Sequence, residues 1–234
     1  MPDLASLRAR NAARWANAKL TRASEFGPVA ARLAAPAAKA RYQAIEAKTG
    51  VPWFFIAVVH QRESSQDWSR SLAQGDPWNK KSTHVPKGRG PFASFEDAAV
   101  DALTNCAPYA ARNTDWSIGG LLTLLEQYNG LGYFNRGLPS PYVWSGTDQY
   151  IKGKYVADGK FDPNVVDKQL GCAGLILAMM QIDSSIKLET VEGPAGVAMK
   201  PPAESPTPSP VNPAKGSLGA LIAGFIASIF NRAA

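Results

Sequence analysis

A wholly apolar segment that runs into a charged one constrains this chain more than any other feature. Residues 53–59 read WFFIAVV, and residues 60–65 read HQRESS. A helix that is hydrophobic on all sides lies in the core of a protein, so the pattern predicts a core helix. The same helix carries Glu63 at its C-terminal end, where apolar sequence gives way to polar sequence. Apolar residues make up 45% of the chain, which is sufficient for a globular core around such a helix.

Helix-boundary residues elsewhere favour a mainly α fold. Gly50 is a typical helix-stop residue, Ser94 and Asp97 form a capping box, and Asp115 is a candidate cap for the helix that follows it. Helices are expected at residues 36–49, 53–65, 98–103, 116–129 and 172–182. Residues 66–90 are polar and rich in Gly, Pro and Asn, which predicts a long loop or a small hairpin.

The composition divides the chain into four regions. They are an N-terminal helical extension (residues 1–35), a main domain that holds almost every aromatic residue (36–190), a proline-rich linker (191–214) and an apolar tail (215–234). The linker composition predicts a semi-extended spacer. The uncharged part of the tail begins at Gly216 and ends at Phe230, which is shorter than the ~20 apolar residues that span a bilayer. We expect this segment to contact a membrane.

The overall charge favours an anionic partner without selecting one. The formal net charge is +6, which suits nucleic acid, acidic lipid or bacterial cell wall. The basic residues form no stripe and no helix-turn-helix pattern is present, so no nucleic-acid partner is expected. Basic side chains interrupt every apolar run before Lys48, so no secretory signal is predicted and synthesis in the cytoplasm is expected.

The cysteines and histidines are too few and too scattered for a metal centre. Cys106 and Cys172 are not in a CxxC pair, and His60 and His84 are the only histidines. We therefore expect neither a metal nor a cofactor. The two cysteines could form one disulfide or be two buried thiols, and the second alternative is favoured.

Glu63 is the candidate catalytic residue. A carboxyl group at the end of a core helix is partly removed from water and meets the negative end of the helix dipole. Both effects raise its pKa. A raised pKa suits a general acid that protonates a leaving glycosidic oxygen near neutral pH. A surface glutamate paired with Arg62 is the alternative.

Three motifs in order resemble the lysozyme-like superfamily, which includes lytic transglycosylases and phage endolysins. They are HQRESS at 60–65, EQYNGLGY at 126–133 and SPYVWSGTDQYIKGKYVADGKFDP at 140–163, the last similar to the signature of a bacterial and prophage lysozyme family. The resemblance covers residues 39–186 and implies a lysozyme-like helical domain over 36–190. It implies cleavage of the β-1,4 bond between MurNAc and GlcNAc in peptidoglycan glycan strands, at the bacterial cell wall. Glu63 is then the acid, and Ser64 helps to orient the substrate. The Gly-Leu-Met-Gln motif of transglycosylases is absent.

Aromatic and amide side chains in polar sequence are candidates for the sugar-binding cleft, because aromatic faces cover sugar rings and amides bond their hydroxyls. The substrate-binding candidates are Ser64, Trp78, Tyr128, Asn129, Tyr142 and Trp144, with Gln74, Asn79, Tyr133 and Phe134 as further ones. The candidates for a second carboxylate, which a hydrolase needs and a transglycosylase does not, are Asp67, Asp76 and Glu126.

Two other functions stay open at this stage. The first is a chitinase-like or chitosanase-like glycosidase, which shares the acid but not the substrate. The second is a non-catalytic module that binds the cell wall and is tethered by the apolar tail.

Overall fold

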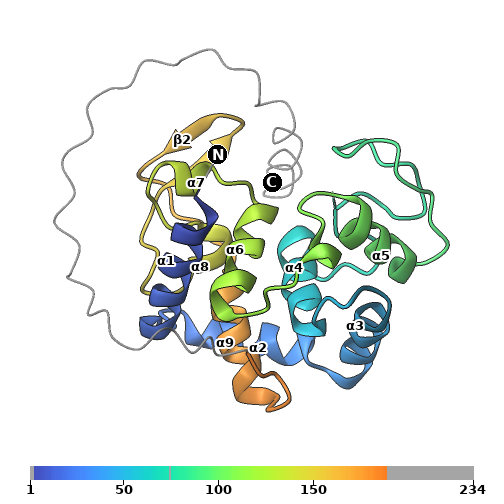
Figure 1. Cartoon of the computed structure of the whole chain (residues 1–234), viewed down its shortest axis with the longest axis horizontal. Coiled ribbons are helices and arrows are strands. Elements are labelled where there is room, and N and C mark those ends of the chain that lie inside the picture. The colour runs from blue at the N-terminus through green and yellow to red at the C-terminus, as the bar shows by residue number, and fades with distance from the viewer. Residues whose placement is uncertain (1–2, 74, 189–234) are drawn as a thin grey trace.

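The computed structural model describes residues 3–73 and 75–188, and this part of the chain is mainly helical (Figure 1). The helices are α1 (Leu4–Asn17), α2 (Ala23–Leu33), α3 (Pro36–Thr49), α4 (Trp53–Ser64), α5 (Phe95–Asn105), η1 (Ala110–Arg112), α6 (Ile118–Tyr128), α7 (Gly132–Asn135), α8 (Pro141–Trp144) and α9 (Cys172–Ile182). Strands β1 (Lys154–Ala157) and β2 (Lys160–Asp162) form an antiparallel hairpin. The predicted mainly α class is confirmed. The predicted linker, the apolar tail and Gln74 lie outside the described residues.

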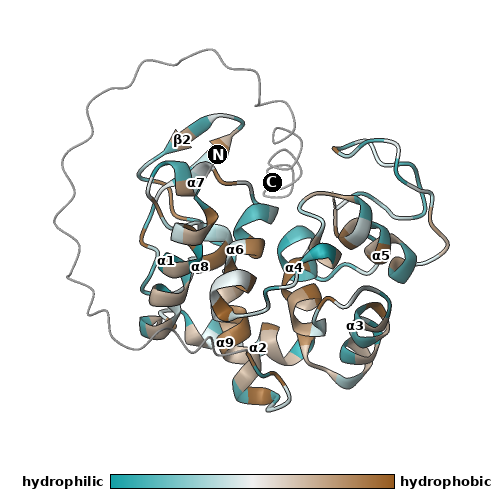
Figure 2. Ribbon diagram, in the orientation of Figure 1, coloured by the Kyte–Doolittle hydropathy of each residue, from teal (hydrophilic) through white to brown (hydrophobic). Residues whose placement is uncertain are grey.

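Helix α4 is the core helix that the sequence predicts. Every residue from Trp53 to His60 is buried, and α4 packs against α2, α3 and α9. The helix ends because Ser65 adopts a left-handed conformation, with φ 57°, and its N–H donates to the carbonyl of Gln61. Figure 2 shows hydrophobic residues on the inner helices and hydrophilic residues along the loop that follows α4.

The predicted N-terminal helices are present, and they share the core of the main domain. Phe26 of α2 is fully buried. A Cβ at Gly174 would lie 2.3 Å from the Phe26 ring, so only glycine allows α2 and α9 to approach this closely. Helix α1 packs along α6. The N-terminal segment therefore belongs to the same hydrophobic core.

Local structure differs from the sequence prediction at two places. Ser117, not Asp115, is the N-cap of α6, and its hydroxyl accepts from the N–H of Gly120. Asp115 instead accepts from the N–H and hydroxyl of Ser117, so it supports the cap from two residues before it. The hairpin of β1 and β2 was not predicted, because strands of four and three residues leave too little alternation to detect.

The remaining predictions about local structure hold for the described residues. The segment between α4 and α5 is a long loop with one isolated bridge, between Arg70 and Pro77. Cys106 and Cys172 are free and buried.

No helix in residues 3–73 and 75–188 is both long and apolar enough to cross a membrane.

Candidate active site

Glu63 occupies the last turn of α4 and is almost completely enclosed. The residue is 6% exposed, and the loop that follows α4 approaches its backbone. A Cβ at Gly75 would lie 3.1 Å from the backbone oxygen of Glu63. Burial raises the pKa of Glu63 to about 8, since water no longer stabilises the charged form. Glu63 is therefore a protonated acid at neutral pH.

The two oxygens of Glu63 have different surroundings. The hydroxyl of Tyr142, on α8, donates to Oε1 over 2.8 Å, so Oε1 is the carbonyl oxygen of the protonated group and Oε2 carries the proton. Oε2 has no hydrogen-bond partner within residues 3–73 and 75–188. The side chain is thus held by one oxygen and has its proton on the other.

Tyr142 is itself fixed by α4. The guanidinium carbon of Arg62 lies 4.7 Å from the centre of the Tyr142 ring. Tyr142 is fully buried, so the prediction that it binds sugar in an open cleft is wrong. Its hydroxyl positions the acid instead.

Tyr128 and Trp144 are also buried rather than exposed in a cleft. Tyr128 is 3% exposed, stacks edge-on against Phe55 at 5.9 Å, and has a pKa raised first by burial and then by the Glu63 charge. Tyr128 therefore lies beside the acid but inside the core. Trp144 is 0% exposed. Helix α8 packs against α6 and α9, so Trp144 is a core residue and its prediction as a sugar-binding ring is wrong.

The other predicted binding residues have mixed surroundings. The Ser64 hydroxyl donates to the carbonyl of His60, and Ser64 is buried, so its hydroxyl is engaged within its own helix. Trp78 is half-buried and its indole N–H donates to the carbonyl of Trp68. Asn129 is half-buried at the C-terminal end of α6. Trp78 and Asn129 retain surface that a ligand can reach. Among the further candidates, Tyr133 is buried, Phe134 is half-buried and Asn79 is exposed.

Two of the candidate second carboxylates organise the loop after α4. Asp67 accepts from the N–H and hydroxyl of Ser69 and pairs with Arg70. Asp76 accepts from the backbone N–H groups of Thr83 and His84 and from the His84 ring. Burial opposes ionisation of both carboxyls, but these hydrogen bonds outweigh it and hold each pKa below its ordinary value. Both groups are committed to loop structure.

Glu126 faces α1 rather than Glu63. Its Oε2 accepts from Asn11 of α1 at 3.5 Å, and burial raises its pKa to about 7. Tyr128 lies two positions further along α6 and is the residue close to Glu63. Residues two apart on a helix point in nearly opposite directions. The structure therefore places the Glu126 carboxyl against α1 rather than beside the acid.

A buried ion-pair network next to the acid was not predicted. Arg62 Nη2 lies 3.2 Å from Asp167, which also bonds Lys154 at 2.9 Å. Arg62 therefore pairs with Asp167, not with Glu63, and the alternative of a surface Arg62–Glu63 pair is wrong. Asp167 lies in polar, irregular sequence that carries no signal for burial.

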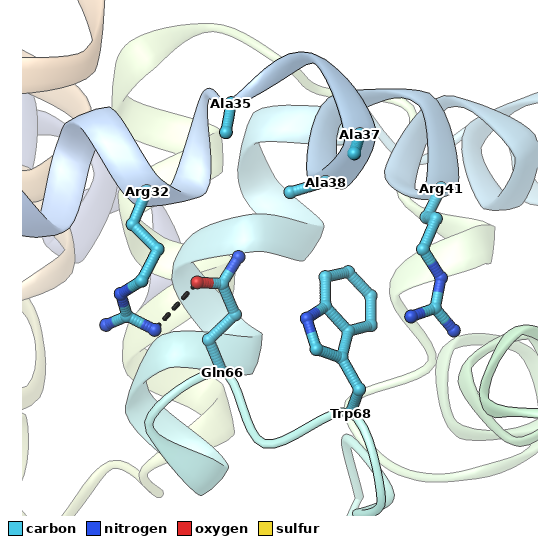
Figure 3. A pocket seen from close by; sticks show the side chains of 7 residues that line it. All are labelled: Arg32, Ala35, Ala37, Ala38, Arg41, Gln66 and Trp68. Atoms are coloured by element: carbon cyan, nitrogen blue, oxygen red, sulfur yellow. Dashed lines mark hydrogen bonds between the residues drawn. The ribbon is translucent and has the colours of Figure 1, made fainter.

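A pocket between α2, α3 and the loop that follows α4 was also not predicted (Figure 3). It has a volume of about 470 Å³ and is lined by Arg32, Ala35, Ala37, Ala38, Arg41, Gln66 and Trp68. Arg32 and Arg41 stand at its two ends, with Gln66 and Trp68 between them. Its residues come from α2, α3 and the loop after α4, so only the fold brings them together.

The chain was compared with protein-family models, curated proteins and solved structures, and none of them matches. Within the described ranges, no group of three or more His, Cys, Asp or Glu could hold a metal ion.

The Tyr142 hydroxyl should tune the acid. Its hydrogen bond favours the ionised carboxylate, so Tyr142→Phe should raise the pKa of Glu63 and move the alkaline limb of the pH–activity profile to higher pH. The loss of one hydrogen bond, worth about 1.5 kcal/mol, should also lower activity about tenfold through poorer positioning. Profiles of kcat/KM on peptidoglycan for both proteins measure this shift. An unchanged alkaline limb would show that Tyr142 does not act on the titrating group.

Proposed function

We propose that this protein cleaves peptidoglycan glycan strands, with Glu63 as the general acid. The observation that carries the proposal is the Glu63 carboxyl group. It is enclosed, protonated at neutral pH, fixed at Oε1 by Tyr142 and without a described partner at Oε2. A glycosidase needs such an acid to protonate the leaving oxygen. The order of the Glu-Ser, Tyr-Asn-Gly and Tyr-Val-Trp-Ser-Gly motifs supports the lysozyme-like family and its peptidoglycan substrate, and the net charge of +6 suits an anionic wall.

In the proposed reaction, Glu63 Oε2 gives its proton to the glycosidic oxygen between MurNAc and GlcNAc. The bond from C1 of MurNAc to that oxygen breaks. Asp67, Asp76 and Glu126 are all committed to other contacts, which supports attack on C1 by the 6-hydroxyl of the same MurNAc rather than by a water activated by a second carboxylate. The proton of that hydroxyl returns to Glu63, and the product is a 1,6-anhydro sugar. Lytic transglycosylase activity is therefore the form of the function that these residues support best.

The products distinguish this route from hydrolysis. Purified peptidoglycan treated with the protein should release fragments with 1,6-anhydro-MurNAc ends, each lighter by one water than the corresponding reducing fragment. Mass spectrometry of the soluble products measures this directly. Reducing MurNAc ends would indicate a muramidase, and chitin oligomers cleaved faster than peptidoglycan would favour the chitinase-like alternative.

A further inference from the structure

The pocket lined by Arg32, Arg41, Gln66 and Trp68 has the properties of a site for anionic groups. Arg32 is held in place by neutral acceptors only. Its Nη1 donates to Gln66 Oε1 at 2.7 Å and to the Ser65 carbonyl at 3.2 Å, and its Nη2 donates to Gln61 Oε1 at 2.9 Å. No carboxylate in the described part of the chain forms an ion pair with it. The Arg32 guanidinium is therefore fixed at one end of the pocket, and no carboxylate in the described part of the chain neutralises its charge.

The opposite end holds a second guanidinium on a rigid aromatic platform. The Arg41 guanidinium carbon lies 3.9 Å from the centre of the Trp68 ring, and its Nε forms an ion pair with the Glu96 carboxylate, which offsets part of its charge. Tyr42 stacks on Trp68 with ring centres 5.2 Å apart. Neither the indole nor the guanidinium can swing away without losing these contacts, so the terminal nitrogens of Arg41 are presented in one orientation.

Between the two arginines, Ala35, Ala37 and Ala38 line one wall of the pocket, and Gln66 and Trp68 line the opposite wall (Figure 3). Helix α3 begins here without a side-chain cap, so the positive end of its dipole adds to the charge of the arginines. A ligand that fits carries carboxylates for the arginines and places a small side chain against the alanine wall.

This pocket is close to the proposed acid. Gln66 follows Glu63 by three residues, so their Cα atoms are at most about 11 Å apart. A hydrogen-bond chain also joins the pocket to the turn after Glu63. Gln66 donates to the Tyr42 hydroxyl, and His60 Nε2 donates to the Asp67 carbonyl, which can only accept. His60 Nδ1 therefore accepts from the Tyr42 hydroxyl, at 2.9 Å.

We propose that this pocket binds the carboxylates of the peptide stem carried by the muramic acid residue at the cleavage site, an inference that rests on the proposed function. Peptidoglycan stems are short acidic peptides that contain alanine, and their carboxylates and alanine methyl groups match the arginines and the alanine wall. An extended stem of four or five residues spans roughly 13–18 Å, enough to reach from a sugar held at Glu63 to the pocket. The pocket thus selects glycan strands that still bear their stems.

Two variants test the pocket without disturbing the acid. Arg32→Gln removes the uncompensated charge. Ala37→Glu places a negative charge in the pocket at an exposed position, and an acidic residue in the first turn of a helix is favourable for folding. Lys48→Gln is the matched control, because it removes one positive charge from the far end of the same helix, α3.

The binding probe is a synthetic stem tetrapeptide with free carboxylates, titrated calorimetrically into the full chain, with its fully amidated form as the comparison. Wild type and Lys48→Gln should bind the free acid at least tenfold more tightly than the amidated form, and Arg32→Gln and Ala37→Glu should lose that preference. Equal binding of both forms, or equal binding by all four proteins, would overturn the proposal. So would a glycerol-phosphate polymer that binds Arg32-dependently while the tetrapeptide does not.

Cleavage rates distinguish a failure of this inference from a failure of the proposed function. Wild type should cleave intact peptidoglycan at least tenfold faster than strands stripped of stems by an amidase, and Arg32→Gln should reduce only the faster rate. If neither substrate is cleaved but the tetrapeptide binds, the function of Glu63 fails and the pocket assignment holds. If both substrates are cleaved equally, the enzyme assignment holds and the stem site is wrong.

Discussion

Glu63→Gln should abolish cleavage of peptidoglycan while the fold is retained. Glutamine keeps the shape of the side chain and can still accept the Tyr142 hydrogen bond at its amide oxygen. It cannot transfer a proton to the leaving oxygen. General acid catalysis is worth about 10²–10⁴-fold, so the loss should be plain in a turbidity assay of cell walls. Unchanged circular dichroism would show that the fold is intact.

The same substitution should have a pH-dependent effect on stability. The pKa of Glu63 is about 8 in the folded chain, against an ordinary value of 4.5. Between these values the folded state binds more protons than the unfolded state, so the free energy of unfolding of the wild type falls as pH rises. The glutamine of the variant has no such proton. The variant should therefore gain stability over the wild type from pH 4.5 to pH 8, by roughly 3–5 kcal/mol.

Glu126→Gln is the matched control for both effects. Glu126 is also a buried carboxyl with a raised pKa, about 7, but it faces α1. Its substitution should give a similar pH-dependent gain in stability and leave cleavage unchanged. Walls cleared by Glu63→Gln as fast as by the wild type would refute the role of Glu63. Loss of activity in Glu126→Gln would show that Glu126 acts as a second catalytic carboxylate.

Features encoded locally could be predicted from the sequence. The core helix follows from seven apolar residues in succession, and the raised pKa of Glu63 follows from its position at the end of that helix. The sequence also predicted the helix of residues 36–49, its end at Gly50 and the N-cap at Ser94. Each of these features depends on residues within one or two helical turns.

Features that depend on distant segments could not be predicted. Trp144 lies in glycine-rich and polar sequence typical of a surface, yet α8 is a single turn covered by α6 and α9. The pocket between α2, α3 and the loop after α4 brings Arg32 to Gln66 across 34 positions. Asp167 lies 105 positions from Arg62, and nothing near either residue indicates that they meet.

The pairing of Arg62 with Asp167 should make a large contribution to stability. Both side chains are almost fully buried, at 3% exposure. Asp167→Ala leaves the Arg62 guanidinium buried without its partner, and breaking a buried pair in this way costs about 3–5 kcal/mol. For a chain of this size, the midpoint of thermal unfolding should fall by about 10 °C. Differential scanning calorimetry measures the change.

A surface ion pair and a double variant test whether the burial of the charges causes the expected loss of stability in Asp167→Ala. Glu25 pairs with Arg22 in solvent, so Glu25→Gln removes an ion pair of the same kind with little change in midpoint. Arg62→Met combined with Asp167→Leu removes both buried charges and should recover most of the stability lost in Asp167→Ala. If Asp167→Ala unfolds no more readily than Glu25→Gln, the pair does not stabilise the fold. Because Arg62 also packs on Tyr142, which holds Glu63, a double variant that is stable but slow in cleavage would show that the buried pair positions the acid as well.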